Sequence, residues 1–199
     1  HSIEGRNWSE FTSALAGDKP LHIRPCLLNY TEDSLRGLYQ SEYCMRAVMQ
    51  YLSANAIVQT EVENFPFSAY SKSTKFTFLQ CALSCIFGAD GVTLSISDHM
   101  GTPLESDPSI GEMLRVNKPF FSALIDSCRE GNAKGIGLIH AEDGTRHVHL
   151  KPDSNWRGLC AGGDAWRKVL EALGYAVSYG KSETYALSGQ VVRSLSDER

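Results

Sequence analysis

The sequence has no long apolar run, no basic excess and no closely paired cysteines, and each absence argues against a class of protein. No stretch approaches the ~20 apolar residues that cross a membrane, and no charged-then-apolar signal peptide opens the chain. The formal net charge of −4 argues against nucleic-acid binding through a basic patch. We therefore expect neither a membrane nor a nucleic acid as a partner.

Cofactor and metal motifs are also missing. No Gly-x-Gly-x-x-Gly and no Walker-type loop follows a candidate strand, which argues against nucleotide-binding folds. The 6 cysteines show no CxxC spacing, and Cys81 and Cys85, four residues apart, have no further ligand beside them. We expect no cofactor and no metal. Free thiols slightly favour the cytoplasm, although the sequence leaves the compartment unknown.

What is present is the composition of a globular protein. Of 199 residues, 42% are hydrophobic and 21% charged, which suits one large domain or two small ones. Residues 1–6 include Ile3-Glu4-Gly5-Arg6, a protease site used to remove tags, and are interpreted as an expression scar. Both ends of the chain suggest a piece of something longer.

Strands alternate with helices along residues 7–130. Apolar and β-branched runs predict the strands, and a period near 3.6 predicts the helices. The expected strands are 21–29, 56–64 and 91–97, and the expected helices are 35–52, 73–87 and 109–128. Such alternation indicates βα units around a parallel sheet, whose chemistry lies at the carboxyl ends of the strands in a (β/α) barrel.

Polar residues follow all three strands. They are Arg24 and Asn29, then Glu61, Glu63 and Asn64, then Asp98 and His99. Alternation places Glu61 and Glu63 on one face of their strand. One interpretation is a carboxylate nucleophile or acid/base in a polar cleft. The other is that the carboxylates simply pair with Arg24 or a lysine at a solvated rim.

The C-terminal third predicts a connector and a second domain. Gly135–Leu150 has the pattern of a β-hairpin with an Asp143-Gly144 turn. Residues 131–163 are therefore interpreted as hairpin and linker, and a helix is expected from Asp164. His147 and His149 alternate on the expected strand, near His140, and a polar surface strand is favoured over a metal site.

Several motifs resemble a known enzyme family. They are Arg24-Pro25, Gln59–Pro66, Ser71–Ser73, Gly88-Ala89-Asp90-Gly91 and Asp98–Gly101. Over residues 20–125 these motifs resemble the C-terminal part of a β-galactosidase-like (β/α)8 barrel, similar to glycoside hydrolase family 42 of clan A. Residues 164–199 resemble the start of the amidotransferase-like α/β domain that follows the barrel in that family.

The resemblance implies a partial (β/α)8 barrel of about three βα units, whose strands would be the sixth, seventh and eighth. Glu61 would be the nucleophile at the end of strand seven, with Glu63 as the fallback. The expected substrate-binding residues are Arg24, Asn29, Asn64, Asp98 and His99.

In that family an Asn-Glu pair supplies the acid/base, and no Asn-Glu dipeptide occurs in this sequence. A retaining glycosidase needs both carboxyl groups. We therefore expect a fragment of a retaining, galactoside-cleaving hydrolase that is inactive alone. Its open sheet edges predict a homo-oligomer. The alternative is a non-catalytic carbohydrate-binding or structural α/β domain.

Overall fold

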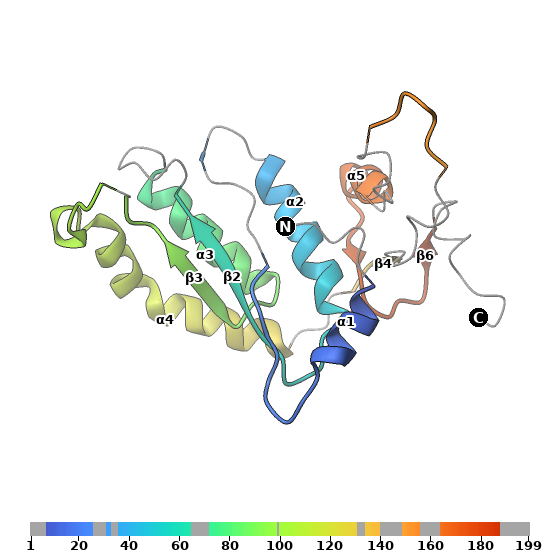
Figure 1. Cartoon of the computed structure of the whole chain (residues 1–199), viewed down its shortest axis with the longest axis horizontal. Coiled ribbons are helices and arrows are strands. Elements are labelled where there is room, and N and C mark those ends of the chain that lie inside the picture. The colour runs from blue at the N-terminus through green and yellow to red at the C-terminus, as the bar shows by residue number, and fades with distance from the viewer. Residues whose placement is uncertain are drawn as a thin grey trace. The chain divides into compact units, whose positions relative to one another are not determined.

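The computed structural model (Figure 1) describes residues 7–25, 31–32, 36–64, 72–98, 100–130, 134–139, 149–155 and 164–187. These residues form two compact units. The first comprises the described residues within 19–45 and 53–132, and the second those within 7–18, 46–52 and 134–187. No helix in the described ranges is long and apolar enough to cross a membrane.

The first unit contains a three-stranded parallel sheet in the order β1-β2-β3, of which Figure 1 labels β2 and β3. Its strands are β1 (His22–Ile23), β2 (Ile57–Glu63) and β3 (Gly91–Ser95). Helix α2 (Arg36–Met49) lies between the first two strands in the chain, and α3 (Thr74–Ile86) between the last two. The predicted α/β class with parallel strands is confirmed.

The two faces of the central strand differ in character. Val58, Thr60 and Val62 are almost completely buried and point to one face. Helix α3 packs against β2 and β3. Gln59, Glu61 and Glu63 point to the other face, where the register places Thr93 and Ser95 of β3 beside the two glutamates. One face of the sheet is therefore rich in polar side chains.

Local signals set the bounds of α3. Ser73 is its N-cap, with its Oγ accepting a hydrogen bond from the Phe76 amide at 3.1 Å. The chain leaves the helix at Gly88, whose φ of 95° favours glycine. The helix predicted from about Ser73 to Phe87, ending at Gly88, is thereby confirmed.

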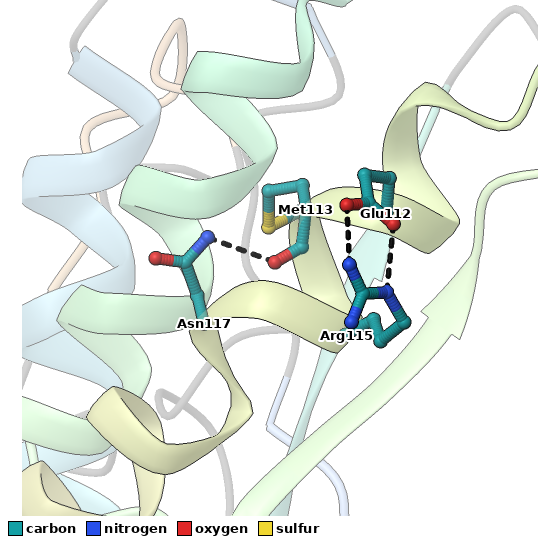
Figure 2. A network of polar contacts seen from close by, with 4 residues as sticks. All are labelled: Glu112, Met113, Arg115 and Asn117. Atoms are coloured by element: carbon teal, nitrogen blue, oxygen red, sulfur yellow. Dashed lines mark hydrogen bonds and ion pairs between the residues drawn. The ribbon is translucent and has the colours of Figure 1, made fainter.

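Helix α4 (Ser109–Glu130) packs against α3 and follows a short 3-10 turn, η1 (Leu104–Ser106). The Phe78 ring stacks on Phe120 at a centroid distance of 5.8 Å. Figure 2 shows polar contacts within the helix, where Arg115 donates two hydrogen bonds to the Glu112 carboxylate and Asn117 donates to the Met113 carbonyl oxygen. These local contacts stabilise the first half of a largely exposed helix.

The second unit has its own parallel sheet, in the order β5-β4-β6. Its elements are α1 (Trp8–Leu15), β4 (Ile136–Leu138), α5 (Asp164–Ala172), β5 (Val177–Ser178) and β6 (Tyr185–Ala186). The last residues of α2, from Arg46, also belong to this unit. There Arg46 donates to the Val177 carbonyl oxygen at 2.5 Å and lies over the Tyr179 ring.

The hairpin predicted over Gly135–Leu150 is wrong for its first arm. Strand β4 pairs in parallel with β5 on one side and β6 on the other, so no antiparallel arm can pair along the same residues. The expected turn at Asp143-Gly144 lies outside the described residues. The division into units also differs from the expected boundaries, because α1 and β4 group with the C-terminal elements.

Candidate functional site

An ion pair lies at the carboxyl ends of β1 and β2. The Arg24 guanidinium contacts the Glu61 carboxylate at 2.8 Å from Nη1 to Oε1. The Glu61 amide also donates to the Pro25 carbonyl oxygen at 3.0 Å, which fixes the two strand ends together. The Glu61 side chain is 9% exposed, whereas that of Arg24 is 57% exposed. A buried carboxylate is thus held by a cation that remains open to solvent.

Glu63 lies beside this pair on the same face of β2. Burial raises the pKa of its carboxyl group, and a hydrogen bond from Glu63 to Glu61 and the negative charge of Glu61 raise the pKa further. The charges of Arg24 and Lys72 act in the opposite direction. The two glutamates therefore form a coupled carboxyl pair in which Glu63 holds a proton more readily than an isolated glutamate does.

Lys72 lies close to the two glutamates. The sequence alone had assigned no function to this residue. Its Nζ donates to the Glu63 carbonyl oxygen and to the Gln80 Oε1, each at 2.5 Å. Desolvation lowers the pKa of Lys72 to about 8, partly offset by the charge of Glu63. In the sequence, Lys72 stands out only as a lysine directly before the Ser73 cap. Its hydrogen-bond partners, Glu63 and Gln80, depend on how β2 packs on α3.

Two predicted site residues have other surroundings. Asn64 follows β2 in the alternation of Thr60 and Val62, opposite to Glu61 and Glu63. Its backbone amide donates to the Ser95 carbonyl oxygen at 3.0 Å, and its buried Oδ1 accepts no hydrogen bond from the described residues. Asp98 accepts from the amides of Met100 and Thr102, so its carboxylate stabilises its own loop.

The structure therefore brings together three of the predicted residues: Arg24, Glu61 and Glu63. Asn29 and His99 lie outside the described residues, as do His140 and His147. Within the described ranges, no three His, Cys, Asp or Glu side chains gather as metal ligands. Cys81, Cys85 and Cys128 are free thiols, and burial raises the pKa of Cys81 to about 11.

The arrangement presents two adjoining carboxyl groups, one paired with Arg24 and one with a raised pKa, on a polar sheet face at the carboxyl ends of parallel strands. Such strand ends are where parallel βα folds bind their ligands. No protein-family model, characterised protein or solved structure matches the chain. The function therefore has to be argued from the chemistry of Arg24, Glu61, Glu63 and Lys72.

Proposed function

We propose that the chain provides the nucleophile side of a retaining glycoside hydrolase site, with a galactoside-like substrate and Glu61 as the nucleophile. The strand order supports a barrel-like architecture. Parallel strands in the order β1-β2-β3, with α2 and α3 between them in the chain, follow the order of consecutive βα units in a (β/α)8 barrel, in which right-handed crossovers put the helices on one face of the sheet. The face with Glu61 would then be the inner one.

The observation on which the proposal rests is the Arg24–Glu61 ion pair beside Glu63. A glycosidase nucleophile must be ionised and held in place before it attacks. The 2.8 Å contact from Arg24 places a positive charge beside the Glu61 carboxylate and holds it in position. The carboxyl group of Glu63, whose pKa burial and the neighbouring Glu61 raise, adjoins the proposed nucleophile.

Glu63 is not suited to the acid/base role. It lies two residues along the same strand and the same face, ~6.5 Å from Glu61 between Cα atoms. A retaining mechanism needs the two carboxyl groups on either side of the scissile bond, at about 5–5.5 Å. The acid/base group would have to approach from residues beyond this pair, so we expect no substantial turnover by the purified chain.

The nucleophile can be tested without the acid. A galactoside with fluorine in place of the hydroxyl at carbon two and dinitrophenolate as leaving group needs no protonation to react. A Glu61 oxygen forms a bond to the anomeric carbon while the bond to dinitrophenolate breaks, and the phenolate leaves with the electron pair. We expect one ester per chain, located on Glu61 by intact mass and peptide mapping.

Matched variants make the result specific. Glu61→Gln should lose labelling, and Glu63→Gln should retain it. Glu112→Gln, which changes an exposed carboxylate on α4, should leave labelling unchanged. Saturable galactoside binding with no ester in the unmodified chain would refute the nucleophile and would instead assign a non-catalytic carbohydrate-binding domain.

A further inference from the structure

Lys72 is a buried cation directly behind the end of β2. Only 5% of the residue is exposed, and its Nζ donates short hydrogen bonds to the Glu63 carbonyl oxygen and to the Gln80 Oε1. Gln80 belongs to α3 and is fully buried. An ammonium group is costly to bury unless acceptors replace its water. By donating to both acceptors, Lys72 links the last residue of β2 to the middle of α3.

The next residue extends this connection to the segment after β1. The Ser73 amide and Oγ both donate to the Glu32 Oε2, at 3.0 and 2.5 Å. The same Oγ accepts from the Phe76 amide as the N-cap of α3. Lys72 and Ser73 therefore connect three segments: the end of β2, the first turns of α3, and the residues that follow β1.

We propose that Lys72 is a positioning residue of the carboxyl pair, whose ammonium group holds the end of β2 against α3 and thereby sets the place and charge of Glu63 beside Glu61. Any catalytic role of Lys72 rests on the proposed function. The hydrogen bonds that support it belong to the protein whether or not a sugar binds.

The charges around Lys72 support the same assignment. The titratable groups that act on it are Glu63, Glu32 and Cys81. The Cys81 thiol, with a pKa raised to about 11, is neutral at physiological pH. Lys72, with a pKa of about 8, is then mainly an ammonium group at neutral pH, and its charge lowers the pKa of Glu63 against the effect of burial.

Carbon-13 NMR titration tests the assignment. In Lys72→Met the Glu63 carboxyl signal should titrate at higher pH than in the unmodified chain, because a nearby positive charge is lost. Lys75→Met is the matched control, since Lys75 is exposed on the first turn of α3 and removes the same charge. It should leave the Glu63 titration unchanged. An equal Glu63 midpoint in all three proteins would overturn the proposal.

A measurement on the unmodified chain covers the case in which Lys72→Met does not fold. The Glu63 carbonyl carbon should show a step near pH 8, as the amine that donates to it loses its charge. Absence of that step would refute the contact. Both readouts are independent of sugar, so failed labelling of Glu61 alongside a normal Glu63 response would reject the glycosidase proposal and retain the role of Lys72.

Discussion

At the scale of single residues, the site contains two glutamates whose carboxyl groups have different surroundings. Glu61 and Glu63 are chemically the same and lie on one face of one strand. Arg24 contacts Glu61, whereas Lys72 contacts only the main chain of Glu63. One carboxyl group thus lies in an ion pair and the other has a raised pKa, and such differences in surroundings are how paired carboxylates acquire separate roles.

The raised pKa of Glu63 predicts how stability depends on pH. A carboxyl group whose folded pKa lies above its unfolded pKa favours folding at low pH, and that contribution is lost as the pH rises through the folded pKa. Glu63→Gln should therefore be more stable than the unmodified chain at pH 7. The gain should be less than about 1 kcal/mol, because Glu63 is partly exposed and solvent screens its charge.

Urea unfolding at several pH values between 4 and 7 measures this difference. Glu112 supplies a control of opposite sign, since hydrogen bonds from Arg115 lower its pKa and its ionised form favours the folded state. Glu112→Gln should lose stability relative to the unmodified chain as the pH rises through the carboxyl range. A Glu63→Gln protein that is less stable at pH 7 than at pH 4, relative to the unmodified chain, would contradict the assignment.

At the scale of elements, side chains closely approach the backbone of β4 at Gly137. A Cβ on Gly137 would overlap the Tyr185 ring and lie 2.9 Å from the Ser182 Cβ. Strand β4 has partners on both sides and has little freedom to shift. Gly137→Ala should therefore destabilise the second unit by about 1–3 kcal/mol through overpacking.

Tryptophan fluorescence during urea unfolding reports on this change, because Trp8 and Trp166 both belong to the second unit. Gly111→Ala is the matched control. Gly111 lies in the first turn of α4, in the first unit, with open space around it, so alanine there should leave the unfolding transition of the second unit unchanged. If both alanine variants unfold alike, the close packing of β4 on β6 is incorrect.

The elements also show what sequence reasoning can and cannot reach. The bounds of α3 follow from a serine cap and a glycine exit, both local signals. The partners of Ile136–Leu138 lie about 40–50 residues later in the chain, and three apolar residues do not specify them. Alternation brought Glu61 and Glu63 to one face, whereas Lys72 required knowledge of how β2 and α3 pack.

At the scale of the whole molecule, the sheet of the first unit has two free edges among the described residues. Strands β1 and β3 each pair only with β2 there. Unpaired strand edges favour pairing with another chain unless charge, proline or a covering segment prevents it. We therefore propose that the chain forms a homo-oligomer through these edges.

Sedimentation velocity over a hundredfold concentration range tests this, with a species larger than 21.9 kDa expected at high concentration. The exposed apolar residues of α4, including Val116 and Phe120, provide a competing surface for association. Val116→Glu places a charge on that surface and leaves both edges intact, so it should not change the oligomer. A monomer at every concentration would contradict self-pairing through the sheet edges. An oligomer that dissociates in Val116→Glu would instead place the contact on α4. The reason is that burying an unpaired carboxylate in that contact would cost several kcal/mol.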